Sequence, residues 1–364
     1  MVRRSLLIPA SAGLAATLLV GSLTVAATPA GAARPSTIAR FAAPSAIQSV
    51  GPWIVVSNRA SSTLTVLAAD GGAFIRGVSH AVLGISAPSA IVTVTTGGRR
   101  LVLVGGDGGK VSELAFTMEG SWVVVDHLGV LRPEGCGAGA STWLATDGHG
   151  HVVEACSTGA LSVWTAATGH LDRSIPSSTT GLTDAAGLAV LGAIAYATND
   201  AAGAAPDGVT AISLASGRRL FSVTNATSAT YAFATPSGIS SDGAHLWVAN
   251  EKGNTVDELA RGSLALLGSS STNLTEPAAV LATPRFTWVS SASVDGWSSM
   301  VTQFSSAGSS IASPWMMCNS NGPYQFDDPS GFTMHGGMLW VANASDDLID
   351  QMNGSSGALV GTYT

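Results

Sequence analysis

The 364-residue sequence has few charged side chains and almost no lysine. Charged residues make up 11% of the chain, against about 25% in an average soluble protein. Lys110 and Lys252 are its two lysines, and the formal net charge is −7. Long charged helices and coiled coils are therefore not expected. A basic face that could neutralise phosphates is missing as well, so we expect no nucleic acid among the partners.

Motifs of common catalytic machinery are also missing. The sequence has no Gly-x-Ser-x-Gly nucleophile motif, and no glycine-rich phosphate loop that follows a strand and opens a helix. Its three cysteines, Cys136, Cys156 and Cys318, have a spacing that fits no zinc motif. An odd number of cysteines leaves at least one without a partner in the same chain. We therefore expect no bound cofactor.

The N-terminus has the pattern of an export signal. Arg3 and Arg4 precede an apolar stretch over residues 6–27, and Pro29 and the small residues 30–32 follow it. We predict a signal peptide over 1–32, a short linker over 33–43 and a secreted protein. Both the general and the twin-arginine export routes are compatible with this segment. No second long apolar run follows, so we expect no membrane span in the mature chain.

An internal repeat is the strongest feature that is present. Residues 236–250 and 329–343 align without a gap, and nine of their fifteen positions are identical. Further copies occupy 277–291 and 44–58, and weaker ones fill the gaps. Seven anchor positions recur at intervals of 41 to 52 residues, namely Asn58, Gly105, Ala155, Asn199, Asn250, Ser291 and Asn343.

Each repeat contains four short runs with the pattern of β-strands. In the fifth repeat, Asp242-Gly243 is a tight-turn signal between the first two runs. Four strands at a period of 40 to 50 residues are typical of propeller blades. We predict an all-β, seven-bladed β-propeller of four-stranded antiparallel blades over 44–364. We expect it to be a monomer.

The repeat resembles a known family. The pattern Pro-Ser-Gly-Ile, Asp-Gly, Leu-Trp-Val-Ala-Asn and Asn-Thr-Val looks like the NHL and YVTN class of propeller repeats, over about residues 44–364. This class includes enzymes, binding proteins and surface proteins, so the resemblance implies a fold and leaves the function open. Lactone hydrolases and virginiamycin-type lyases are more distant relatives. In such enzymes carboxylates or histidines surround the axis, usually with a divalent cation.

Most repeated polar and aromatic residues have a structural interpretation. Trp247, Trp288 and Trp340 recur at one blade position and are expected to pack between blades. The anchor asparagines end the second strand, where they stabilise turns or form a polar ring around the channel mouth. The histidines of Asp147-Gly-His149-Gly-His151 can pair on a metal, but this segment aligns with a hairpin turn. Glu154 is expected to be a solvated carboxylate at a strand end, with a catalytic role as the alternative.

The longest break in the repeat covers residues 305–328. It contains Trp315 and Tyr324 among polar and small residues. It is predicted to lie on the channel-mouth face, which is the face of the propeller where each outer strand connects to the next blade. This composition suits recognition. Packing of the segment over the blade edge is the other interpretation. The candidate ligand-binding residues are Trp315, Tyr324, Asn58, Asn199, Asn250 and Asn343.

Two cysteines are predicted to form a disulfide. Cys136 precedes the first strand of the third blade, and Cys156 follows the anchor of the same blade. Both positions belong to the channel-mouth face, where their Cα atoms can approach to the ~5.5–6 Å that a disulfide prefers. Cys318 is not part of this prediction.

Two functions from different classes remain open. The first is an exported, non-catalytic propeller that binds a protein, glycan or small ligand at the channel-mouth face. The second is a metal-dependent hydrolase or lyase, similar to lactonases or streptogramin lyases, with a divalent cation in the channel. We prefer the first, because the repeat has asparagine or small residues where it would otherwise carry acids. Whether the protein is an enzyme stays open at this point.

Overall fold

The structure is a computed structural model. It describes residues 41–119, 122–132, 135–137, 139–201, 206–228, 230–231, 233–292, 299–306, 312–319 and 322–364. The predicted signal peptide and most of the predicted linker lie outside these residues. The last linker residues are described, and Phe41 is buried in a cluster with side chains of the first and last blades. No helix among the described residues is long and apolar enough to cross a membrane.

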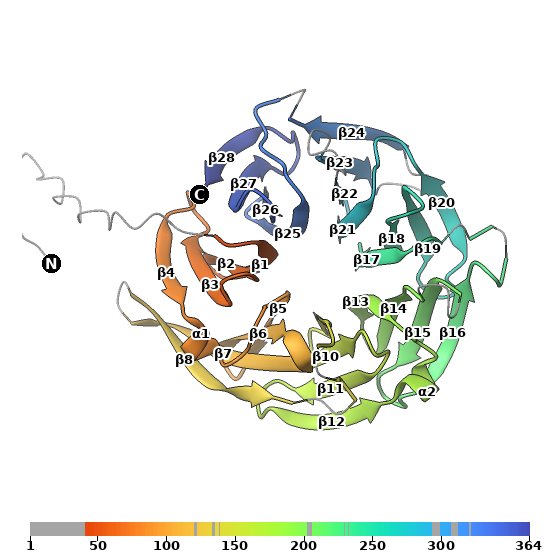
Figure 1. Ribbon diagram of the computed structural model, residues 1–364, viewed down its shortest axis with the longest axis horizontal. Helices are drawn as coiled ribbons and strands as arrows, with labels where there is room; N and C mark the ends of the chain where they lie inside the picture. The colour runs from red at the N-terminus through yellow and green to blue at the C-terminus, as the bar shows by residue number, and fades with distance from the viewer. Residues whose placement is uncertain are drawn as a thin grey trace, which may run out of the picture. The chain divides into compact units, whose positions relative to one another are not determined.

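The chain forms seven four-stranded antiparallel sheets, arranged as blades around an axis (Figure 1). In every blade the strands follow chain order from the axis to the rim. The first three blades are β1(Pro44–Val50), β2(Trp53–Asn58), β3(Thr63–Ala68), β4(Phe74–Val78); β5(Ala90–Thr96), β6(Arg99–Gly106), β7(Lys110–Glu119), β8(Trp122–Leu131); and β9(Thr142–Thr146), β10(His151–Cys156), β11(Leu161–Thr165), β12(His170–Ile175).

The other four blades repeat this arrangement. They are β13(Ala185–Leu191), β14(Ile194–Asn199), β15(Gly208–Ser213), β16(Arg219–Thr224); β17(Pro236–Ser241), β18(His245–Asn250), β19(Thr255–Ala260), β20(Leu266–Ser270); β21(Pro277–Ala282), β22(Phe286–Ser291), β23(Met300–Ser305), β24(Ala312–Cys318); and β25(Pro329–His335), β26(Met338–Asn343), β27(Leu348–Asn353), β28(Leu359–Tyr363). The predicted all-β, seven-bladed fold is confirmed. Three short helical turns lie on connections, namely α1(His80–Leu83), η1(Asp107–Gly109) and α2(Ser177–Thr180).

The ring closes without strand exchange. The first blade consists of β1–β4 and the last of β25–β28, so closure depends on contacts between two complete sheets. The Ser330 hydroxyl donates a 2.6 Å hydrogen bond to the Pro44 carbonyl oxygen. The Ser49 backbone N–H donates to Thr333 Oγ1 at 3.0 Å. The two ends of the propeller are therefore joined by side chains of their innermost strands.

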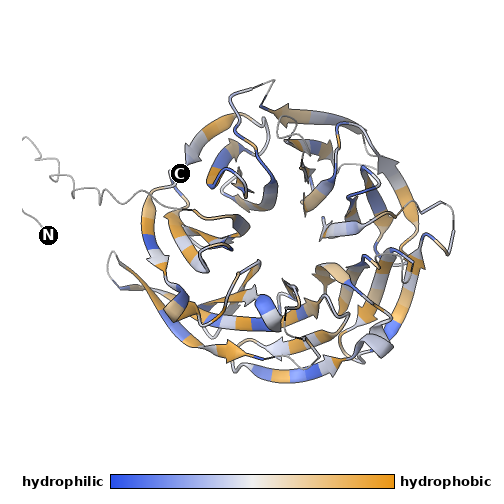
Figure 2. Ribbon diagram, in the orientation of Figure 1, coloured by the Kyte–Doolittle hydropathy of each residue, from blue (hydrophilic) through white to orange (hydrophobic). Residues whose placement is uncertain are grey.

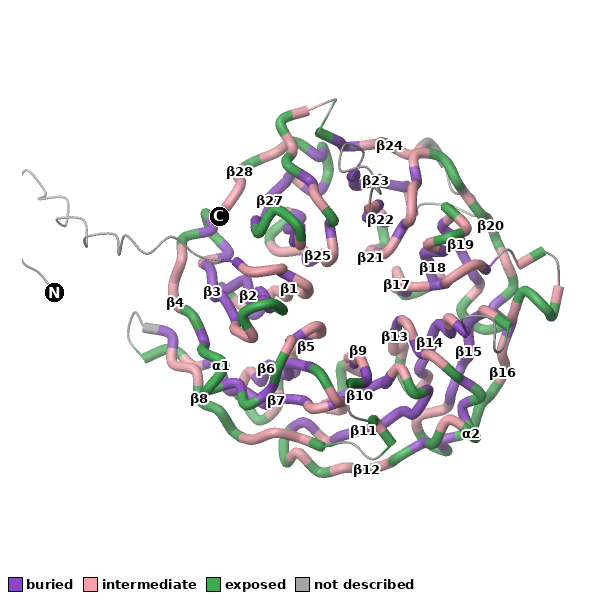
Figure 3. The backbone as a smooth tube through the Cα atoms, viewed as in Figure 1, coloured by how far each residue is buried: buried purple, intermediate pink, exposed green. Residues whose placement is uncertain are grey.

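The core is divided among the blade interfaces. Seven hydrophobic clusters each combine side chains from two neighbouring blades, and one of them joins the last blade to the first. Buried residues concentrate in the second and third strands, as Figure 3 shows and as the fully buried β2 illustrates. The outermost strands carry both hydrophilic and hydrophobic residues (Figure 2). Each sheet thus buries its central strands between neighbours and exposes one edge to solvent.

The repeated tryptophans support this packing. Trp247, Trp288 and Trp340 are at most 1% exposed, and each belongs to a different blade interface. Trp247 lies against Phe304 of the next blade, with ring centroids 6.4 Å apart. The expectation of packing between blades is therefore correct for all three.

Candidate functional site

A cavity of about 490 Å³ lies on the axis of the ring, lined by residues of the innermost strand of every blade. Most of its wall comes from the beginnings of these strands. These beginnings lie on the face where the blade connections and the turns between second and third strands meet, which we call the channel-mouth face. Serines at or beside the start of five inner strands line the cavity, namely Ser45, Ser89, Ser141, Ser237 and Ser330.

Several of these serines connect neighbouring blades. The hydroxyl of Ser45 donates to the Pro88 carbonyl oxygen at 2.7 Å, and that of Ser237 donates to Pro277 at 3.2 Å. The Ser330 hydroxyl makes the corresponding bond across the ring closure. Each bond joins two blades at the mouth of the cavity. The wall of the cavity is therefore fixed before any ligand arrives.

The cavity has little charge. Arg59, an exposed residue in the turn after β2, is the charged side chain among its lining residues. The apolar part includes Ile47, Trp143 and Phe332. The described lining residues include no carboxylate and no imidazole. Such a surface can hold a ligand by shape, hydroxyl groups and backbone polar groups, whereas acid–base chemistry needs titratable side chains.

The anchor asparagines do not line this cavity. Asn58, Asn250 and Asn343 are fully buried, and Asn199 is 5% exposed. Their side-chain amides bond within their own blades, such as Asn250 Nδ2 to Asp257 Oδ2 at 2.9 Å. The structure therefore places these residues where they stabilise turns, and it does not bring them together at the mouth.

Asp257 and Asp350 are the buried partners of two of these asparagines. Burial raises the pKa of both carboxyls, and hydrogen bonds, including those from Asn250 and Asn343, partly oppose the shift. Asn343 Nδ2 lies 3.4 Å from Asp350 Oδ2. In the first blade Asn58 donates instead to the neutral Thr65 hydroxyl at 2.9 Å. The same asparagine position is thus used with two kinds of partner.

The segment 305–328 is more regular than predicted. Residues 312–318 form β24, the outermost strand of the sixth blade, so this part is not an irregular connection. These residues pair antiparallel with β23 and form the fourth strand of the sheet. Trp315 lies on this strand at the rim and is 45% exposed. The structure does not bring it together with the anchor asparagines, which end second strands.

Tyr324 lies on the connection from β24 to β25. Its ring stacks on Phe326 with centroids 5.2 Å apart, and its hydroxyl donates to the Gly357 carbonyl oxygen at 3.0 Å. The rings of Trp315 and Tyr324 therefore both approach the turn around Gly357 of the last blade. Tyr324 is half-buried and packs against the hydrophobic cluster between the last two blades.

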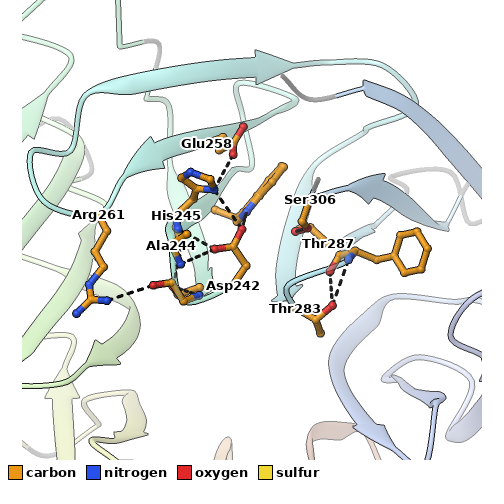
Figure 4. A network of polar contacts seen from close by, with 12 residues as sticks. Asp242, Ala244, His245, Glu258, Arg261, Thr283, Thr287 and Ser306 are labelled. Carbon is orange, nitrogen blue, oxygen red and sulfur yellow. Dashed lines mark hydrogen bonds and ion pairs between the residues drawn. The ribbon is translucent and has the colours of Figure 1, made fainter. Parts of the chain in front are cut away.

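A polar network lies at the turn between β17 and β18 of the fifth blade. His245 Nδ1 lies 3.3 Å from Asp242 Oδ2 and 3.1 Å from Glu258 Oε1 (Figure 4). Burial tends to raise the pKa of Asp242, but backbone N–H bonds from His245 and Ala244 outweigh it, and the pKa is lowered. Burial raises the pKa of Glu258, and His245 partly opposes the shift. This cluster fixes the turn between β17 and β18, at the opposite end of β17 from the cavity.

The third blade repeats this turn. Asp147 accepts the backbone N–H of His151 at 3.0 Å, and its second oxygen lies 2.7 Å from His151 Nδ1. The hairpin-turn interpretation of this segment agrees with the structure, and His149 is exposed. His151 and Asp172 border a second cavity of about 260 Å³ between blades three and four. The imidazole of His151 and the carboxylates of Asp147 and Asp172 line this cavity, which lies away from the axis.

The structure contains a disulfide between Cys136 and Cys156, with Cα atoms 5.7 Å apart. It joins the connection before β9 to the end of β10. Cys156 is the last residue of β10, as Asn250 is of β18, so the anchor of the third blade is Cys156 and not Ala155. The sequence match in this weak repeat places the anchor one residue too early. Cys318 is buried on β24 and does not take part in this disulfide.

The sequence-based expectation of a solvated Glu154 is wrong. The residue is 0% exposed, because it lies on the second strand and faces the neighbouring blade. Burial raises its pKa to about 8, and the Trp164 indole lowers this value only in part. One carboxylate oxygen lies within 4.8 Å of the sulfur atoms of both Cys136 and Cys156. The signal that could have found it is the glutamate among apolar residues in the β10 segment.

Comparisons with known proteins support the fold alone. No protein-family model matches the sequence, and no curated protein matches it. A chain of the mitotic checkpoint complex crystal structure matches with a TM-score of 0.62 and 12% identity, covering 86% of this chain and 92% of that one. Sqt1 of Chaetomium thermophilum, bound to the N-terminus of ribosomal protein L10, matches with a TM-score of 0.61 and 14% identity over 90% and 91%. Sqt1 solved alone gives 0.61 and 13% over 90% of each chain.

Proposed function

We propose that this protein is an exported, non-catalytic propeller that binds a segment of a partner protein at its channel-mouth face, over the axial cavity. The observation that carries the proposal is the cavity of about 490 Å³ with a prearranged, weakly charged wall of serines and apolar residues. Preorganised walls improve affinity because little freedom is lost on binding. In this proposal the protein acts as a monomer and needs no cofactor.

The choice of a protein partner has separate support. The Sqt1 structure contains a propeller of the same overall fold bound to the N-terminus of another protein. A chain terminus is narrow, and its backbone N–H and C=O groups can bond to the hydroxyls around such a mouth. Arg59 at the edge adds a single positive charge. We therefore infer an extended segment with at least one carboxylate as the ligand.

Export is supported by two independent features. The N-terminal segment has the arginines, apolar stretch and small residues of a signal peptide. Disulfides persist mainly outside the cytosol, and Cys136 and Cys156 are linked. N-terminal sequencing of the protein recovered from the medium tests this point, with a mature chain that begins near residue 33 as the expected result.

The hydrolase or lyase alternative receives less support. Its metal would need carboxylate or imidazole ligands near the axis, and the described lining of the cavity has neither. Metal analysis of the dialysed protein distinguishes the two functions. One tightly held divalent ion per chain would favour the enzyme.

Peptide selection tests the binding proposal. We would select binders from a random peptide library displayed on phage, using the full-length protein, and measure their affinities for variants. Ala186→Trp fills part of the cavity and Arg59→Glu reverses its charge. We expect each change to weaken binding at least about tenfold, because one occludes the site and the other repels carboxylates.

A rim substitution serves as the matched control. Val360 is 55% exposed on the outermost strand of the last blade, so Val360→Trp adds the same side chain away from the cavity. Its affinity should equal that of the wild type. Trp315→Ala tests the rim tryptophan as a binding residue. Loss of binding in this variant, with full binding by Ala186→Trp, would place the site at the rim and overturn the proposal.

A further inference from the structure

Glu154 occupies a strand position that holds valine in four other blades, namely Val56, Val248, Val289 and Val341. The second strands end in His-Val-Val-Glu-Ala-Cys in the third blade, His-Leu-Trp-Val-Ala-Asn in the fifth and Met-Leu-Trp-Val-Ala-Asn in the last. Glu154 therefore corresponds to Val248 and Val341. All three side chains are fully buried. A buried carboxyl group destabilises a fold where valine would stabilise it, so a role other than packing is indicated.

The surroundings of Glu154 keep its proton in place. Within the sheet it pairs with Leu144 on β9 and Ser162 on β11. The Trp164 indole favours the charged form slightly but does not meet the geometry of a hydrogen bond. No charged side chain contributes to the shift, and burial dominates. The carboxyl is therefore mostly protonated at neutral pH.

A second acid faces the same interface from the neighbouring blade. Glu113 lies on β7 between Val111 and Ala115, which pack with Val152 of the third blade. It is buried, and burial raises its pKa as well. Glu113 is the titratable side chain of β7 on this interface, and it is not among the groups within 4.8 Å of the disulfide sulfurs. It therefore offers a matched control for Glu154.

The two cysteines of the disulfide differ in exposure. Cys156 is fully buried, whereas Cys136 is half-buried between the exposed Gly135 and Gly137. We therefore infer that a thiolate from solution attacks the Cys136 sulfur. In thiol–disulfide exchange the attacked sulfur keeps the new bond and the other leaves as a thiolate. The leaving sulfur here is the buried one, beside Glu154.

We propose that Cys136–Cys156 is a site of thiol–disulfide exchange with an external dithiol, and that Glu154 supplies the proton to the departing Cys156 sulfur. The dithiol can be a small molecule or a pair of cysteines in a partner. This activity does not depend on the axial cavity. The carboxyl group replaces the water that would otherwise protonate the thiolate.

The exchange balances in two steps. A thiolate of the dithiol attacks Cys136 Sγ, a mixed disulfide forms, and the Cys136–Cys156 bond breaks. Cys156 leaves as a thiolate and takes the proton of Glu154, which becomes a carboxylate. The second thiolate of the dithiol then displaces Cys136, and the dithiol is released as a disulfide. Solvent protons restore Cys136 and Glu154, so the protein gains two electrons and two protons while the dithiol loses the same.

Reduction kinetics of the folded full-length protein test the proposal. The probe is dithiothreitol between pH 6 and 9, with oxidised glutathione in parallel to correct for the thiolate content of the reductant. A proton donor with a pKa of about 8 is about nine-tenths protonated at pH 7 and about one-tenth at pH 9. We expect the corrected rate to fall about tenfold over this range.

Two variants separate proton donation from a structural effect. Glu154→Gln should lose the pH dependence and react at pH 7 about tenfold more slowly than the wild type. Glu113→Gln, which removes the buried acid that faces this interface from the second blade, should keep the wild-type profile. Tryptophan fluorescence recorded during reduction monitors folding.

Three results would overturn the proposal. They are a flat corrected profile in the wild type, loss of the profile in Glu113→Gln, and reduction that occurs only as fast as the protein unfolds. If Glu154→Gln does not fold, the wild-type profile and the Glu113→Gln profile decide the question by themselves.

Discussion

The third blade and the fifth blade use the same positions for different purposes. In the fifth blade the second strand carries the buried Trp247 and Val248 and ends in Asn250, whose amide bonds to Asp257. In the third blade Glu154 stands at the position of Val248 and Cys156 at the position of Asn250. A disulfide replaces the asparagine contacts.

The two blades therefore have the same strand arrangement with different chemistry at these positions. The fifth blade stabilises its strand end with hydrogen bonds and dense packing. At the corresponding strand end the third blade has no asparagine. It has a cross-link to the connection that precedes β9. In the third blade the buried carboxyl of Glu154 lies beside the disulfide sulfurs, and neither of its oxygens has a hydrogen-bond partner among the described residues.

The largest expected effect concerns the packing of the fifth blade. Trp247→Ala should lower the free energy of unfolding by about 3–5 kcal/mol, because a large cavity opens between two blades. Urea denaturation measures the loss. The control is Trp315→Ala at the rim, which should destabilise the protein less, because this side chain is 45% exposed. Equal losses for the two variants would contradict the role of the repeated tryptophan.

The pH dependence of stability tests the burial of Glu154 in the third blade. The pKa of Glu154 is about 8 in the folded protein and 4.5 in the reference state, so the folded state binds the extra proton between these values. Stability contributed by this group should therefore fall as pH rises from about 5 to 8, by about 1.4 kcal/mol per pH unit.

Urea denaturation at several pH values, with Glu154→Gln as the comparison, measures this slope. The glutamine variant should lack the part of the slope that belongs to Glu154. Glu113→Gln should retain it, since its own carboxyl is a separate group. A slope that is identical in the wild type and Glu154→Gln would show that Glu154 is not buried in solution as it is here.

The disulfide should have the next largest effect. Replacing both cysteines, as Cys136→Ala with Cys156→Ala, opens a cross-link between residues separated by 20 positions. The chain-entropy model gives a loss of about 3 kcal/mol. Denaturation with and without a reductant measures it. The wild type should become less stable in the reductant, and the double variant should not respond; a response of the double variant would point to Cys318.

The smallest effect tests the asparagine position. Asn250→Ala removes a hydrogen bond to the buried Asp257 and should destabilise the protein by about 1–3 kcal/mol. Asn58→Ala, whose partner is the neutral Thr65, should lose less, about 0.5–1.5 kcal/mol. Parallel urea curves compare the two. A larger loss for Asn58→Ala would mean that the aspartate partner contributes nothing.

The fold was largely predictable, because repetition multiplies a weak signal. A short alternating run such as His245 to Ala249 predicts little alone, but its recurrence at blade spacing identifies seven sheets. The packing of the tryptophans followed from the same logic. The outer strand β24 was missed because its sequence matches no other outer strand and contains Pro314 and Cys318.

The candidate site was less predictable. The sequence located the asparagines and Trp315, but not which of them would meet. The asparagines end second strands, and the innermost strands line the cavity and separate it from them. The sequence pattern identifies the strand end but not which side chains reach the axis.

The sequence by itself determined the number of blades, the strand order within each blade and the positions of the buried tryptophans, because all three follow from a periodic pattern of local signals. Only the tertiary structure decided that the serines meet around a cavity, that the asparagines bond within their own blades, and that Glu154 is buried beside Cys136 and Cys156. These are contacts between residues far apart in the chain or in different blades. Burial and proximity depend on how neighbouring sheets pack, and no local pattern encodes that arrangement.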